Sequence, residues 1–120
     1  MPPLTDDTLW AILNDELDDD AVNKLVWQGL GYRETTAGWD SSGVEPAWSE
    51  KYPQPPNFIE SRPATVQLTR SIPATHKQLL KAELGFKGYR VDQLIPRLTR
   101  RATVVNWLLS HRQQQRDRSS

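Results

Sequence analysis

The sequence contains no cysteine and only two histidines, and these absences exclude several kinds of site. Without cysteine the chain forms no disulfide, binds no metal through thiolates and has no cysteine nucleophile. This composition fits a reducing compartment, and we expect a cytoplasmic location. His76 and His111 are too few for a histidine-rich metal site. We expect no bound metal and no cofactor.

Long hydrophobic runs are also absent. The strongest apolar cluster, residues 104–109, is far shorter than the roughly 20 residues that a membrane-spanning helix needs. Residues 1–7 lack the basic and apolar stretches of a secretory signal peptide, and their acidity argues against an organellar transit peptide. We therefore expect a soluble protein without a membrane partner.

The short motifs of common enzyme classes are missing as well. The chain has no G-x-S-x-G nucleophile elbow, no glycine pattern of a P-loop and no H-E-x-x-H zinc motif. The acidic residues around Asp18 do not fit an EF-hand, because Val22 occupies the fifth loop position and the glycine of the sixth position is missing. Helix capping and a solvated turn explain these acids better. We predict no catalytic residue, although one sequence does not exclude an enzyme.

Charge is present in quantity but is unevenly distributed. The chain has 15 basic and 15 acidic residues, so its formal net charge is zero. Residues 1–60 hold 12 of the acids and 3 of the bases, and residues 61–120 hold 12 bases and 3 acids. A uniformly basic nucleic-acid binder is thereby excluded, whereas a molecule with an acidic and a basic half is allowed.

The N-terminal third has the pattern of two capped helices. Thr5 is a candidate N-cap for the first, and the acidic run that includes Asp18 offers a second cap. Gly29 lies on the apolar stripe of the second helix, where glycine suggests close approach of another element. Gly31 is predicted to end that helix in the left-handed conformation, and Gly85 follows a similar sequence later in the chain.

The central segment is rich in tryptophan and proline. Turn residues around Trp39 are compatible with a short β-hairpin within residues 32–45. Six prolines fall between Pro46 and Pro73, and the aromatic residues among them suggest that this segment is wrapped onto the core rather than acting as a linker. Residues 64–72 fit either a strand or a helix.

The C-terminal half is predicted to be helical. Ser71 is expected to cap a helix over residues 73–84, which is followed by a short helical piece at 91–95 and a longer helix at 98–114. The fold class is therefore mainly α: a compact, single-domain helical bundle over residues 1–112. Residues 113–120 are polar, and we expect them to form a flexible tail.

The candidate binding residues are the basic and aromatic side chains of the C-terminal half: Lys77, Lys81, Lys87, Arg90, Arg97, Arg100, Arg101 and Trp107. Those on the last helix are interpreted in one of two ways. They form an exposed strip that binds phosphate or an acidic partner, or the helix is packed on two sides and the arginine stems cover apolar surface. We favour core packing for Trp107 and leave both interpretations open for the arginines. A helix-turn-helix is weakly supported, because the helical piece at 91–95 is too short to fill a major groove.

Five stretches of the chain resemble a known family: LWAILNDEL (9–17), PPNFI (55–59), SRPATV (61–66), ELGFKGY (83–89) and LTRRA (98–102). The chain is similar to a small family of uncharacterised single-domain proteins from cyanobacteria and plant plastids, over roughly residues 5–112. The resemblance implies no activity, cofactor or catalytic residue. It does imply a bacterial cytoplasm or plastid stroma, and the lack of a presequence favours the bacterial case.

Two functional hypotheses follow from the charge pattern. The first is a non-catalytic protein-protein interaction or assembly module whose acidic and basic halves are separate surfaces, which allows self-association. The alternative is binding of the nucleic-acid phosphate backbone through the basic C-terminal half. A small-molecule enzyme would need a concave pocket with convergent polar groups. Whether the two halves neutralise each other depends on the fold.

Overall fold

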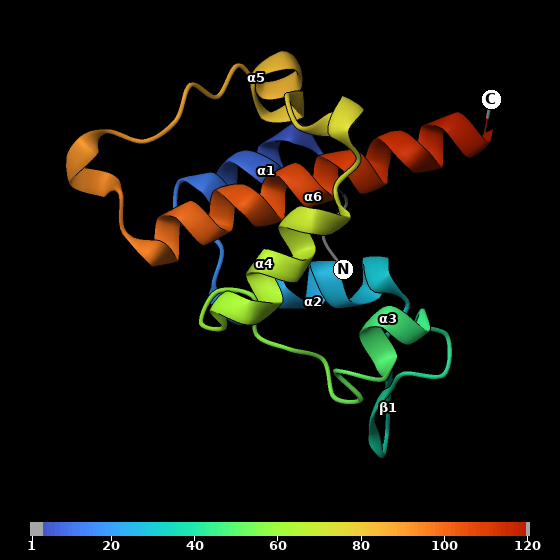
Figure 1. The fold of residues 1–120 in the computed structure, drawn as a ribbon. Helices are drawn as coiled ribbons and strands as arrows, with labels where there is room; N and C mark the ends of the chain where they lie inside the picture. The colour runs from blue at the N-terminus through green and yellow to red at the C-terminus, as the bar shows by residue number, and fades with distance from the viewer. Residues whose placement is uncertain (1–3, 120) are drawn as a thin grey trace.

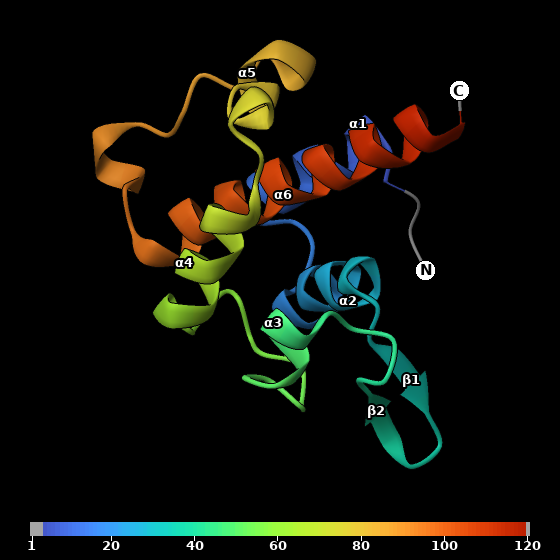
Figure 2. The same ribbon diagram turned by 45° about the vertical axis from the view of Figure 1, so that its right-hand side comes forward.

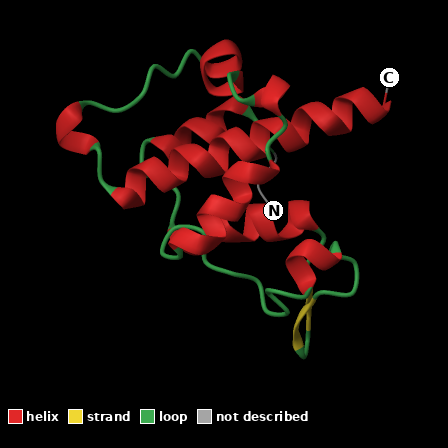
Figure 3. Ribbon diagram, viewed as in Figure 1, coloured by secondary structure: helices red, strands yellow, loops and turns green. Residues whose placement is uncertain are grey.

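A computed structural model describes residues 4–119 as a set of helices around one long central helix, with a two-stranded hairpin at one edge (Figures 1 and 3). The predicted mainly α fold with a short hairpin is confirmed. The elements in chain order are α1 (Asp6–Leu13), α2 (Asp19–Leu30), β1 (Arg33–Thr35), β2 (Gly38–Asp40), α3 (Pro46–Ser49), α4 (Arg62–Ser71), the 3₁₀ turn η1 (Ala74–His76), α5 (Leu79–Leu84), the 3₁₀ turn η2 (Val91–Gln93) and α6 (Pro96–Ser119).

Helix α6 is the axis of the fold. It contacts α1, α2, α4 and α5, and residues 104–110 are all buried. The turned view shows α5 on one side of this axis and α2 and α3 on the other (Figure 2). The helix begins at Pro96, where proline is tolerated in the first turn, and it extends beyond the predicted end at residue 114. Flexibility of the tail stays a prediction.

The two N-terminal caps are confirmed. The Thr5 side chain accepts a hydrogen bond from the Thr8 N–H at 3.2 Å, and Asp18 accepts one from the Ala21 N–H at 2.8 Å. Each cap satisfies an N–H group that lacks a partner within its helix. Acidic residues in the first turn of both helices also interact favourably with the helix dipole.

The predicted helix ends are confirmed too. Gly31 has φ of +109° and Gly85 has φ of +67°, so both end their helices in the left-handed region. Only Gly31 is also crowded, because a Cβ there would lie 2.5 Å from the carbonyl oxygen of Gly43. Gly29 allows the close approach that its position predicts, because a Cβ there would lie 2.8 Å from the Trp107 ring.

The hairpin and the proline-rich segment pack beside α2. In the antiparallel hairpin Arg33 pairs with Asp40, and the half-buried Trp39 ring meets Trp27 edge to face at 5.1 Å. The Trp27 indole N–H donates to the Pro56 carbonyl at 2.6 Å. The proline-rich segment is therefore wrapped onto the core, as the sequence predicts.

Two buried groups anchor this central segment more firmly. Asn23 on α2 is 1% exposed, donates to Asn57 Oδ1 at 3.0 Å and accepts the Phe58 N–H at 2.8 Å. Trp48 is 5% exposed and packs edge to face on Phe58 at 5.7 Å. The side chain of Trp48 therefore belongs to the core.

The region around residue 72 corrects one expectation and decides another. Residues 64–72, which fit either a strand or a helix from the sequence, form most of α4 and its C-cap Ile72. Ser61 caps the start of this helix by accepting a hydrogen bond from the Ala64 N–H. The predicted single helix over 73–84 is wrong, and Ser71 caps nothing there. Ile72 is extended because it precedes a proline, and the chain then makes the separate η1 and α5.

No helix in the described part of the chain is both long enough and apolar enough to cross a membrane.

Candidate interaction surface

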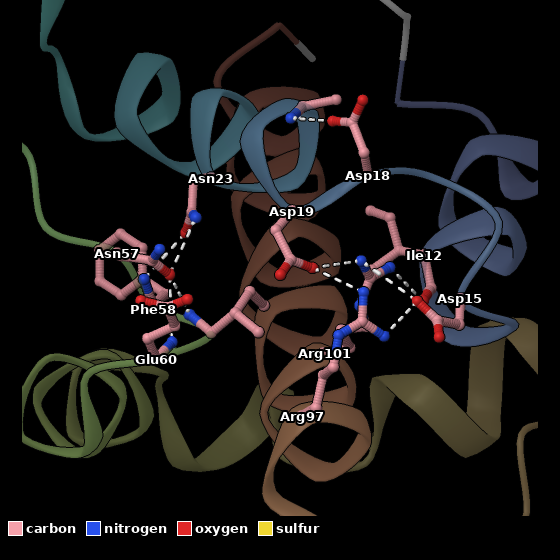
Figure 4. A network of polar contacts seen from close by, with 12 residues as sticks. Ile12, Asp15, Asp18, Asp19, Asn23, Asn57, Phe58, Glu60, Arg97 and Arg101 are labelled. Atoms are coloured by element: carbon pink, nitrogen blue, oxygen red, sulfur yellow. Dashed lines mark hydrogen bonds and ion pairs between the residues drawn. The ribbon is translucent and has the colours of Figure 1, made fainter.

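The acidic and basic halves of the chain meet at an ion-pair network between α6 and the turn that joins α1 to α2 (Figure 4). Arg101 is 0% exposed; its guanidinium donates to Asp19 Oδ1 at 2.6 Å and to the Ile12 carbonyl at 3.1 Å. Arg97 pairs with both Asp15 and Asp19. A third arginine, Arg112, pairs with Asp6 at 3.0 Å. The two halves therefore neutralise each other in part.

The network also sets the ionisation of Asp15. The hydrogen bond from Arg97 lowers the pKa of the Asp15 carboxyl below its ordinary value of 3.8, and the charge of Arg101 lowers it further against partial desolvation. Asp15 has φ of +61°, a left-handed conformation that aspartate tolerates better than most residues. The turn after α1 thereby brings this carboxylate to α6.

Several predicted site residues are consequently not part of an exposed binding strip. Arg101 is buried and Arg97 is paired, so neither offers a free positive charge to a partner. Arg100 donates to the carbonyls of Ile59 and Glu60 at 3.0 and 3.1 Å, which attaches the segment before α4 to α6. Of the two interpretations left open for the α6 arginines, these contacts fit the structural one, in which the arginines join α6 to the rest of the fold.

Trp107 is a core residue, as favoured from the sequence. It is 8% exposed, covers Gly29 and stacks on His111 with ring centroids 5.2 Å apart and planes 7° apart. Burial, with a smaller effect of the Arg118 charge, lowers the pKa of His111 below its ordinary value. These rings border a polar cleft of about 220 Å³ between α6 and the ends of α2 and α4.

The structure brings three of the predicted lysines together. Lys77, Lys81 and Lys87 line an open groove of about 500 Å³ beside α5, together with the apolar side chains of Leu80 and Phe86. We call this feature the lysine groove. Lys77 also donates to the Thr69 carbonyl at 2.6 Å. Among residues 4–119 no acidic side chain forms an ion pair with any of the three.

Arg90, the remaining predicted residue, lies in the segment between α5 and α6. It pairs with Asp92 at 3.4 Å, and both side chains are largely exposed. Around this pair three large apolar side chains, Val91, Leu94 and Ile95, face solvent. Sequence reasoning missed them, because a short apolar run next to a helix usually contributes to the core.

Sequence reasoning also missed the acidic partners of the arginines and one histidine contact. Asp15 and Asp19 were interpreted as a solvated acidic turn, whereas they bind α6 from 78 or more residues away along the chain. His76 was expected on the surface, but its Nδ1 makes a hydrogen bond of 2.7 Å with Ser110, which is 2% exposed. No local pattern predicts contacts of such separation. Among the described residues, no group of three metal-binding side chains is found.

Comparison with known proteins gives two findings. The model of a family described as "Domain of unknown function (DUF1823)" matches residues 3–113. A solved structure described as "Solution NMR structure of the protein" is 57% identical to this chain, with a TM-score of 0.81, and the match covers 97% of this chain and 98% of that one. Comparison with curated proteins finds no match.

Proposed function

For this chain, which belongs to the DUF1823 family of domains of unknown function, we propose a role as a non-catalytic interaction domain that binds an acidic segment of a partner protein in the lysine groove. The observation that carries the proposal is the convergence of Lys77, Lys81 and Lys87 on one open groove. The same groove is also lined by the apolar side chains of Leu80 and Phe86.

The lining of the groove favours a polypeptide. Leu80 and Phe86 are half-buried and add an apolar contact surface to the groove that the lysines line. An acidic segment with one apolar side chain would match both features, since charge steers the encounter and the apolar contact slows dissociation. The three lysines of the groove are exposed, so an extended segment of a partner protein can reach them from solvent.

The phosphate backbone of a nucleic acid fits less well. Its affinity depends on a high density of free positive charge along the strand. Arg97 and Arg101, which would have extended the basic surface along α6, are paired with Asp15 and Asp19. The remaining groove spans one short helix and the turn after it.

The test is a pair of charge-reversed variants used as bait in lysate. Lys81→Glu/Lys87→Glu changes two groove lysines whose side chains form no ion pair with a described residue, and Lys24→Glu/Lys51→Glu reverses the same number of charges on α2 and after α3. We expect the groove variant to lose a protein that the wild type and the control variant both retain. The retained protein should dissociate as salt rises, because exposed charges are screened.

Three outcomes would contradict the proposal. Equal retention by both variants would separate the partner from the groove, and a flat salt response would remove the electrostatic basis. Loss of the partner after nuclease treatment would show that a nucleic acid bridges the two, which is the alternative function. Circular dichroism of both variants checks that the charge reversals leave the fold intact.

We further propose a reducing location, the cytoplasm of a cyanobacterium or a plastid stroma. The support is the lack of cysteine and the resemblance of the five stretches quoted above. Fractionation of the source cells with an antibody to the protein tests it, and recovery in an oxidising compartment would refute it.

A further inference from the structure

The chain between α5 and α6 presents apolar side chains to solvent at a protruding edge of the molecule. Val91 is 88% exposed, Leu94 58% and Ile95 49%, and within the described part of the chain these are the exposed large hydrophobic residues. Figures 1 and 2 both show this segment at the edge of the fold, on the side of α6 that carries α5. We call residues 90–95 the apolar tip.

The apolar tip is ordered by its own contacts. The Arg90 N–H donates to Gln93 Oε1 at 3.1 Å, and the Gln93 N–H donates to the Arg90 carbonyl at 2.8 Å. Before the tip, Tyr89 donates through its hydroxyl to the Leu13 carbonyl at 2.9 Å. After it, Arg97 pairs with the turn that follows α1. The tip is therefore held with its apolar side chains outward, although folding alone would favour covering them.

Basic residues accompany the tip. Lys87 precedes it by a few residues without an ion pair to any described acid, and Lys81 lies on the neighbouring helix. Arg90 adds a further guanidinium, which Asp92 partly balances. An outward apolar group with positive charge beside it is complementary to a surface that is apolar beneath and negatively charged on top.

We propose that the apolar tip inserts into the surface of an anionic lipid bilayer, with Val91, Leu94 and Ile95 below the headgroups and Lys87 and Arg90 among them. The shape of the tip favours a bilayer over a protein partner, since a deformable lipid surface accepts a convex projection without a matching pocket. Peripheral binding of this kind needs no spanning helix. It goes beyond the proposed function, because the inserting residues lie outside the lysine groove, which shares only Lys87 with this surface, and because it needs no protein partner.

The lack of cysteine permits a site-specific test on the whole purified protein. Leu94→Cys and Ala37→Cys each receive one environment-sensitive fluorophore, the second at the exposed turn of the hairpin. Vesicles of phosphatidylcholine alone are compared with vesicles that also contain phosphatidylglycerol. We expect a blue-shifted, brighter emission at position 94 with the anionic vesicles and no change at position 37. An unchanged emission at position 94 would overturn the proposal.

Vesicle co-sedimentation of unlabelled variants completes the test. Val91→Ser/Leu94→Ser/Ile95→Ser should bind anionic vesicles about tenfold or more weakly, since transfer of each apolar side chain is lost. Lys87→Gln/Arg90→Gln should weaken binding to anionic vesicles only, and Lys24→Gln/Lys51→Gln should leave it unchanged. Full binding by the serine variant would refute insertion. If no variant or wild type binds vesicles, and the serine variant abolishes a dimer seen by light scattering, the tip contacts a second copy and the proposal fails.

Discussion

Replacement of Asp19 by asparagine should destabilise the fold far more than the same change at Asp15 or Asp20. Asp19 accepts from the buried Arg101 at 2.6 Å, and its own side chain is 30% exposed. After the change Arg101 keeps its hydrogen bond to the neutral Ile12 carbonyl, but its nearest carboxylate is then Asp15, at 3.4 Å, and its Nε already lacks a partner within the described residues. A guanidinium at 0% exposure would then be left with incomplete charge compensation.

The expected cost follows from the burial of each partner. Removal of one member of a buried ion pair typically costs about 3–5 kcal/mol. Because Asp19 is partly exposed and Asp15 stays nearby, we expect about 2–3 kcal/mol for Asp19→Asn, or roughly 10 °C in Tm at this chain length. Asp15→Asn should cost less than about 1 kcal/mol, because Asp15 is 41% exposed and solvent screens its pairs.

Asp20→Asn is the matched control. Asp19 and Asp20 both lie in the first turn of α2, so both changes remove a favourable interaction with the helix dipole, worth about 0.3–1 kcal/mol. Urea unfolding of the three variants, followed by tryptophan fluorescence, measures the free energies of unfolding. Adding Arg101→Met to Asp19→Asn should recover part of the loss, because the uncompensated charge is removed. Equal losses for Asp19→Asn and Asp20→Asn would refute the reasoning.

Three further predictions concern backbone positions and pH. Gly29→Ala should lower stability by about 1–3 kcal/mol despite the better helix propensity of alanine, because its Cβ would overlap the Trp107 ring; an unchanged thermal midpoint would contradict this close packing. Gly31→Ala should cost more than Gly85→Ala in urea unfolding, since both have positive φ but only Gly31 is blocked by a carbonyl oxygen. The lowered pKa of Asp15 contributes stability that is present above the unfolded value of 3.8 and is lost as pH falls through the folded pKa. Asp15→Asn should therefore lose less stability than the wild type between about pH 5 and 2. Parallel curves of unfolding free energy against pH for the two proteins would refute this.

The features that the sequence predicts correctly are those set by a few adjacent residues. A threonine or aspartate before an acidic first turn identified the starts of α1 and α2, and glycine followed by an aromatic residue identified the ends of α2 and α5. Gly29 is a partial exception. It indicated that another element comes close, although the identity of that element, Trp107, depends on the fold.

The features that the sequence does not predict depend on contacts between residues far apart in the chain. Periodicity at residues 73–84 favoured one helix, but a proline at its start and the hydrogen bond of His76 to Ser110 divide the segment into two pieces. The roles of the arginines on α6 were equally undecidable, since exposure of Arg101 depends on where the turn after α1 lies. The lysine groove was foreseen as separate basic residues and not as one surface.

The charge separation along the sequence has a different meaning in the folded chain than in the unfolded one. Acids of the first two helices pair with arginines of α6, so attraction between the halves contributes to folding instead of leaving two large opposed faces. The cation in each of these ion pairs is an arginine and never a lysine. This division is physically reasonable, since a guanidinium binds carboxylates and carbonyls at fixed geometry, whereas an ammonium group is strongly hydrated and favours the surface. Unpaired positive charge is therefore present around α5 and the apolar tip, the edge that both proposals concern, and a second basic group (Lys51, Arg62 and Arg70) lies beside α4.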